Sequence, residues 1–167
     1  MKLSIYQIDA FAEKAFEGNP AAVVPLEEWL PDSVMQSIAE ENNLSETAFF
    51  VPSESGFHIR WFTPATEVDL CGHATLASAY VLFSILGRKE DTLSFESRSG
   101  LLKVTRAGEL LTLDFPAQPP VQCITSALLS TGLGKEPVVC LEREDYVAVF
   151  ENEEDVFQIA PNQEALM

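Results

Sequence analysis

A glutamate at the head of an apolar run is the first side chain in this sequence that could do chemistry. Glu46 follows Ser45 and precedes residues 47–51, which carry no charge and predict a buried strand. We expect a carboxylate in this place to lie at the mouth of a cleft. There it suits a general base that takes up a proton and gives it back. The alternative is a strand-end acid that faces water or caps a turn, with Ser45 as an ordinary turn residue.

The stretch Cys71-Gly72-His73 is the second candidate. His73 can donate a hydrogen bond or shuttle a proton near neutral pH. Gly72 permits a tight turn into a following helix, whose first N–H groups and dipole form an anion-binding site. The alternatives are a His73 bonded to a neighbouring carbonyl and a Cys71 that is only a small buried hydrophobic residue.

These candidates need a scaffold, and residues 72–87 form its centre. The stretch GHATLASAYVLFSILG has no polar stripe, so it predicts a helix that is buried on all sides. At about 1.5 Å per residue, this helix falls short of the ~30 Å needed to cross a bilayer. We therefore expect a helix inside the protein with strands wrapped around it, and its Gly72-His73 end at the site of chemistry.

The rest of the pattern is that of an α+β fold. Alternating apolar and polar residues between turn signals predict short strands, with hairpins at Ser99-Gly100 and Ala107-Gly108. An amphipathic helix is expected from Pro31 to Asn42, because Pro31 suits a first helical position and Asn42 can end a helix. Strands are predicted over residues 2–11, 21–24, 47–51, 57–63, 92–96, 101–106 and 110–115.

A proline-rich stretch, residues 116–120, marks a predicted domain boundary. Residues 1–116 then form one complete domain. Residues 117–167 form a linker and the opening of an incomplete second domain, with two strands and two short helices. So few elements bury little surface by themselves.

Composition excludes several classes of partner. The chain has 26 acidic and 10 basic residues, a formal net charge of −16, so nucleic acid and anionic membranes would be repelled. Three widely spaced cysteines without a CxxC pair indicate neither a disulfide framework nor a metal site. The N-terminus lacks the long apolar run of a signal peptide, which leaves a cytoplasmic location as the expectation.

Three motifs in this order and spacing carry a resemblance to a known family. They are GNPAAVV (residues 18–24), NNLSETAFFV (42–51) and RWFTPATEVDLCGHATLASAYVL (60–82). Together they resemble the N-terminal half of the phenazine-biosynthesis (PhzF-like) isomerases, which are grouped with diaminopimelate epimerase and proline racemase. The similarity covers nearly all of residues 1–116. It implies two similar halves, each a rolled, mostly antiparallel sheet around a central helix.

The resemblance also implies a function, that of a cofactor-independent isomerase acting on a small carboxylic acid. The family's catalytic glutamate corresponds to Glu46, and its substrate-contacting residues correspond to Gly72 and His73, with Ser45 beside them. Glu46 would move a carbon-bound proton along one face of the substrate. A single carboxylate suffices for such a shift, so neither a metal nor another cofactor is implied.

One departure from the family concerns the second half. The family's Glu-Asp-Pro and Thr-Gly-Ser motifs do not occur here, and the family's active site lies between the two halves. We expect either a truncated chain or a wall supplied by another chain, with a homodimer formed through exposed sheet edges as one solution.

Two other functions remain open. In a cysteine-type racemase or epimerase, Cys71 would be the acid/base, and a second thiol would come from the absent half. Alternatively, the chain is a dimerising or binding domain that keeps the fold without the chemistry. The Ser-Glu-Thr motif at residues 45–47 favours the isomerase. Neither the substrate nor the oligomeric state follows from the sequence.

Overall fold

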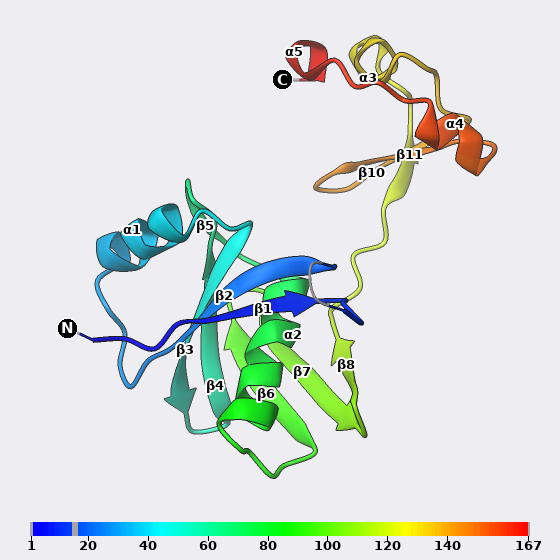
Figure 1. Cartoon of the computed structure of the whole chain (residues 1–167). Coiled ribbons are helices and arrows are strands. Elements are labelled where there is room, and N and C mark those ends of the chain that lie inside the picture. The colour runs from blue at the N-terminus through cyan, green and yellow to red at the C-terminus, as the bar shows by residue number, and fades with distance from the viewer. Residues whose placement is uncertain (1, 15–16, 167) are drawn as a thin grey trace. The chain divides into compact units, whose positions relative to one another are not determined.

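The computed structural model describes residues 2–14 and 17–166 and divides into two compact units (Figure 1). Unit 1 is Met1–Pro116 and unit 2 is Ala117–Met167. Each unit has its own sheet. The candidate residues Ser45, Glu46 and 71–73 all belong to unit 1.

Unit 1 is a single curved sheet around one helix. Its strands follow the order β1-β2-β3-β4-β6-β7-β8, and β5 pairs with β4. The β2/β3 and β4/β6 pairs are parallel and the other pairs are antiparallel. Figure 1 shows these strands curving around α2, which confirms the predicted rolled, mostly antiparallel sheet with a central helix. The strands are β1 (Tyr6–Ala10), β2 (Asn19–Pro25), β3 (Glu46–Ser53), β4 (Gly56–Phe62), β5 (Glu67–Val68), β6 (Thr92–Ser97), β7 (Gly100–Ala107) and β8 (Leu110–Asp114), and the helices are α1 (Asp32–Asn42), α2 (Gly72–Tyr80) and the π-helical turn η1 (Val81–Ile85).

The central helix is buried along most of its length, but its last turns are not. Ala74, Ala77 and Leu82 have at most 1% of their surface exposed, whereas Tyr80 and Leu86 are about half exposed. The prediction of burial on all sides was therefore wrong at this end. The sheet ends at β1 and β8, and a hollow of about 710 Å³ beside Tyr80 is lined by residues of both strands.

Strand β3 has apolar contacts on both faces, as its sequence predicts. Ala48 and Phe50 belong to the core between the sheet and α2. Phe49 and Val51 belong to a second core, which also contains Met35 of α1. Because side chains along a strand alternate between faces, an even-numbered residue of β3 lies on the α2 side of the sheet.

Unit 2 contains more elements than the sequence predicts. Its three-stranded antiparallel sheet has the order β11-β10-β9, and three short helices accompany it. Strand β9 and helix α5 were missed because they have only three and four residues, too few for a periodic signal. The elements are β9 (Val121–Cys123), α3 (Ala127–Leu133), β10 (Val139–Glu142), β11 (Tyr146–Val149), α4 (Glu153–Phe157) and α5 (Gln163–Leu166).

Among residues 2–14 and 17–166, no helix has the length and apolar character needed to span a bilayer.

Candidate active site

Strand alternation directs Glu46 towards the start of α2. Glu46 is the first residue of β3 and lies opposite Ala21 of β2. It has the same parity as Ala48, so its side chain shares the α2 side of the sheet. The Glu46 side chain is 20% exposed, and its position at the mouth of a cleft stays a prediction.

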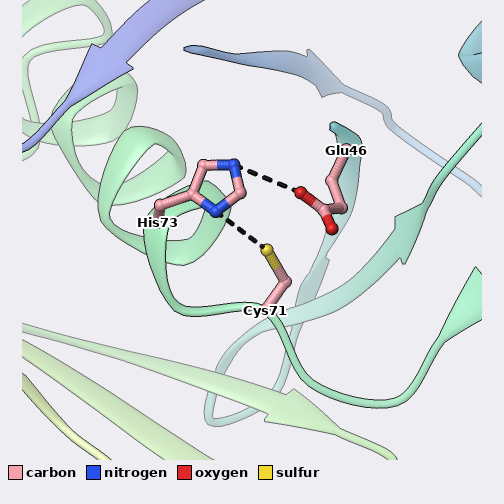
Figure 2. Close-up of side chains that lie close together, drawn as sticks. All are labelled: Glu46, Cys71 and His73. Atoms are coloured by element: carbon pink, nitrogen blue, oxygen red, sulfur yellow. Dashed lines mark hydrogen bonds and ion pairs between the residues drawn. The ribbon is translucent and has the colours of Figure 1, made fainter. Parts of the chain in front are cut away.

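His73 lies between Glu46 and Cys71 (Figure 2). Its Nε2 is 3.3 Å from Glu46 Oε2, and its Nδ1 is 3.4 Å from Cys71 Sγ. His73 Nε2 and Glu46 Oε2 are both buried, but they are not aligned well enough to form a hydrogen bond with each other. No other described residue gives either atom a hydrogen-bond partner. Since buried polar atoms are normally hydrogen-bonded, these two atoms are suited to meet a ligand. The structure thus brings together three of the sequence-predicted candidates.

Burial keeps the Cys71 thiol protonated. Desolvation is the main cause that raises the pKa of Cys71 to about 12; the negative charge of Glu46 adds to it, and a hydrogen bond from the Ala74 N–H opposes it. A protonated thiol can donate to His73 Nδ1. The neutral imidazole then carries its own proton on Nε2, the atom that faces Glu46. Cys71 is therefore poorly suited to be a thiolate base, and a hydrogen bond from its thiol to Nδ1 would favour the tautomer of His73 with the proton on Nε2.

The raised pKa of Cys71 leads to a prediction about alkylation. Iodoacetamide reacts with the thiolate, so in the native chain the alkylation rate of Cys71 should keep rising up to pH 10. In urea the alkylation rate of Cys71 should level off once the pH exceeds the ordinary thiol pKa. At pH 8 the rate in urea should be at least tenfold higher than the rate in the native chain. Mass spectrometry of the tryptic peptide 61–88, which contains only Cys71, measures both rates. A native rate that levels off below pH 9 would contradict the prediction.

The glycine at the start of α2 is required by packing. The backbone φ of Gly72 lies outside the left-handed region, so the expected tight turn does not explain it. A Cβ added at Gly72 would instead lie 3.1 Å from Cε2 of Phe115 and 4.0 Å from Cδ2 of Leu113. The start of α2 therefore lies close to the ring that follows β8. Apart from the Ala74 N–H, which faces the Cys71 thiol, the first N–H groups of α2 have no partner within the helix.

This packing predicts that the cost of Gly72→Ala depends on Phe115. The new methyl group forces the half-buried ring to move, and we expect a loss of about 1 kcal/mol in the free energy of unfolding. In a Phe115→Leu background the same substitution should be neutral or stabilising, because alanine is the better helix former. Urea unfolding of the four variants as a double-mutant cycle measures the difference. An equal cost in both backgrounds would show that the ring is not the obstacle.

Ser45 is placed differently from the other candidates. Its side chain is exposed, and its hydroxyl donates to Asn19 Oδ1 at 3.4 Å. The bond joins Asn19, the first residue of β2, to the residue before β3. Ser45 thus holds two of the sequence motifs side by side, and its predicted contact with a substrate stays a prediction.

A charged network that the sequence analysis missed holds the segment before Cys71. Glu67 of β5 accepts hydrogen bonds from Arg60 Nε at 2.6 Å and Nη2 at 2.7 Å, and from Arg98 at 2.6 Å. The Arg60 guanidinium also lies over the rings of Trp29 and Phe62, and its pKa is raised, mainly by the bond to Glu67. A bidentate, stacked arginine of this kind fixes β5 firmly. The sequence did contain a signal for this network, because Arg60 and Glu67 carry opposite charges on either side of Pro64.

Glu46, Cys71 and His73 also offer donor atoms that zinc binds, all within 4.8 Å of one another. However, His73 presents one ring nitrogen to Cys71 and the opposite one to Glu46. A single ion can bind only one of these two nitrogens. Three hollows on the described surface, of about 360 to 710 Å³, are lined by other residues.

Comparison with curated proteins identifies relatives of this chain. An uncharacterized isomerase of Pseudomonas aeruginosa is 50% identical over 162 residues, which cover 97% of this chain and 62% of the relative. The human phenazine biosynthesis-like domain-containing protein is 50% identical over 127 residues, covering 71% of this chain and 44% of the relative. The chain thus spans less than two thirds of the length of these relatives.

A solved structure and a family model support the relationship to these proteins. A crystal structure of a phenazine biosynthesis protein of the PhzF family from Enterococcus faecalis matches with a TM-score of 0.90 and 48% identity, covering 99% of this chain and 64% of that chain. The model of the PhzC-PhzF family, described as phenazine biosynthesis-like protein, matches residues 8–166. The resemblance seen in the three motifs is therefore confirmed, and the chain belongs to the phenazine biosynthesis-like (PhzC-PhzF) family.

Proposed function

We propose that this chain carries the acid/base wall of a cofactor-independent isomerase that moves a carbon-bound proton in a small carboxylic acid. The observation that carries the proposal is the 3.3 Å approach of Glu46 Oε2 to His73 Nε2 at the start of α2. Isomerase names among the relatives support the reaction class. Because the chain spans only part of those relatives, the activity of the whole protein is part of the proposal.

In this proposal each group has one task. Glu46 removes the proton from carbon and returns it at another carbon on the same face, so one carboxylate serves as both base and acid. The Nε2–H of His73 and the N–H of Gly72 donate to the substrate carboxylate or to the negative charge that develops as the proton leaves. The helix dipole of α2 adds to this stabilisation. No electrons are transferred in such a shift, so the proposal includes no redox cofactor, and the proton held by the 20% exposed carboxyl group can exchange with water before it is returned.

The cysteine-type racemase is the weaker alternative. That mechanism needs a thiolate at Cys71, and burial raises the pKa of this thiol to about 12. We propose instead that Cys71 acts through His73. Serine can also donate to Nδ1 and alanine cannot, so Cys71→Ser should keep most of the activity that Cys71→Ala loses.

Deuterium uptake tests the proposed function. The chain is incubated in D₂O with a panel of small cyclic carboxylic acids, aromatic and saturated, and mass spectrometry follows the gain of deuterium at carbon. We expect at least one acid to gain deuterium faster than in buffer. If no acid exchanges or binds at high concentration, a non-catalytic binding domain becomes the better explanation.

The homodimer expected from the sequence remains a proposal. Strands β1 and β8 end the sheet of unit 1 and offer unpaired edges for such an assembly. Light scattering of the purified chain tests it, and a monomer would count against it.

A further inference from the structure

Two cysteines lie opposite each other in the sheet of unit 2. Cys123 of β9 and Cys140 of β10 are paired in register on antiparallel strands. Directly opposed residues of an antiparallel pair have Cα atoms about 4.5–5.5 Å apart and side chains on the same face. A disulfide needs a Cα separation of about 4.4–6.8 Å. The two strands therefore already hold these cysteines at the spacing of a disulfide.

The surroundings of the two thiols support this pairing. Both cysteines are free in this structure; Cys140 is 2% exposed, and Cys123 is half-buried. The pKa of Cys123 is raised, mainly by desolvation and further by the neighbouring Cys140 thiol, which agrees with their opposed positions in the sheet. Cys123 is the more accessible of the two, so an oxidant in solution would reach it first.

We propose that Cys123 and Cys140 form an oxidation site that a low-molecular-weight disulfide, such as glutathione disulfide, converts into a cross-strand disulfide. The Cys123 thiol loses its proton and attacks one sulfur of glutathione disulfide, which forms a mixed disulfide and releases one glutathione. Cys140 then loses its proton and attacks Cys123 Sγ, which forms the protein disulfide and releases a second glutathione. Two protein thiols are oxidised and one glutathione disulfide is reduced.

The cross-link would close a loop that contains α3. This loop runs from Cys123 to Cys140, and α3 packs against α5, where Leu166 lies over Gly132. A disulfide across such a loop restricts the unfolded chain and stabilises the folded unit. We expect thermolysin to cleave within residues 124–139 at least tenfold more slowly after oxidation, and the original rate to return with dithiothreitol.

Peptide mapping identifies the bond directly. The whole chain is equilibrated with a tenfold excess of glutathione disulfide over glutathione, denatured in N-ethylmaleimide and digested with trypsin. Trypsin places Cys123 in peptide 107–135, Cys140 in peptide 136–143 and Cys71 in peptide 61–88. We expect peptides 107–135 and 136–143 to be joined within one chain, while peptide 61–88 carries N-ethylmaleimide.

Matched variants make the test decisive. Cys71→Ser should keep the link between peptides 107–135 and 136–143, and Cys123→Ser should abolish both the link and the protection against thermolysin. The proposal is overturned if the two peptides remain separate under this excess of glutathione disulfide, carrying either N-ethylmaleimide or glutathione. Links that involve Cys71, or that join two chains, would also overturn it.

Discussion

Glu46→Gln should slow deuterium uptake into the substrate by about 10²- to 10⁴-fold, the usual contribution of a general acid/base. Glutamine keeps the shape of the side chain and can still lie 3.3 Å from His73 Nε2, but it cannot accept a proton from carbon. The fold should therefore survive while the proton transfer is lost. The measurement is the rate of deuterium gain by mass spectrometry, with substrate concentration varied to separate kcat from KM.

The matched control for this substitution is Glu54→Gln. Glu54 is an exposed residue in the turn between β3 and β4, so its replacement removes one negative charge and leaves the site intact. Its exchange rate should equal that of the unchanged chain. Full activity in Glu46→Gln, or a loss confined to Cys71→Ser, would move the assignment from the carboxylate to the thiol.

The sequence predicts the strand and the helix that carry this site because their patterns of apolar residues are clear. Apolar residues on both faces of β3 required two cores, and the structure has one on each side of the sheet. Strand parity then fixes the face of Glu46, and an uncharged helix beginning at Gly72 can only lie on the enclosed side of a curved sheet. The pairing of Glu46 with His73 was expected from the family resemblance of the three motifs, because local patterns left the ordinary alternatives for both residues open.

Local patterns could not predict contacts between residues that are far apart in the sequence. The packing of Phe115 on Gly72 and the pairing of Cys123 with Cys140 depend on strand register, which no local spacing encodes. The exposure of Tyr80 depends on where the sheet ends. The widely spaced cysteines gave no indication of a pair because β9 is too short to be recognised.

Trp61 supports both sides of the candidate site. It lies opposite Ala48 of β3 on one side and opposite Val68 of β5 on the other. It is 1% exposed and shares a core with Cys71. A change in this ring should therefore affect the strand that begins with Glu46 as well as the segment that leads to Cys71.

Trp61→Ala should lower the free energy of unfolding of unit 1 by about 3–5 kcal/mol, because it leaves a large cavity in the core. Trp61→Phe should cost about 1 kcal/mol or less. It keeps most of the apolar volume and removes the indole N–H, which is buried and has no partner within the described chain. Urea unfolding followed by far-UV circular dichroism measures both changes, with Leu110→Ala, at a 76% exposed position, as a control expected within about 0.5 kcal/mol of the parent. If Trp61→Phe proves as costly as Trp61→Ala, the indole N–H must donate a hydrogen bond that the fold needs. The volume of the enclosed ring would then not be what holds β3 against β5.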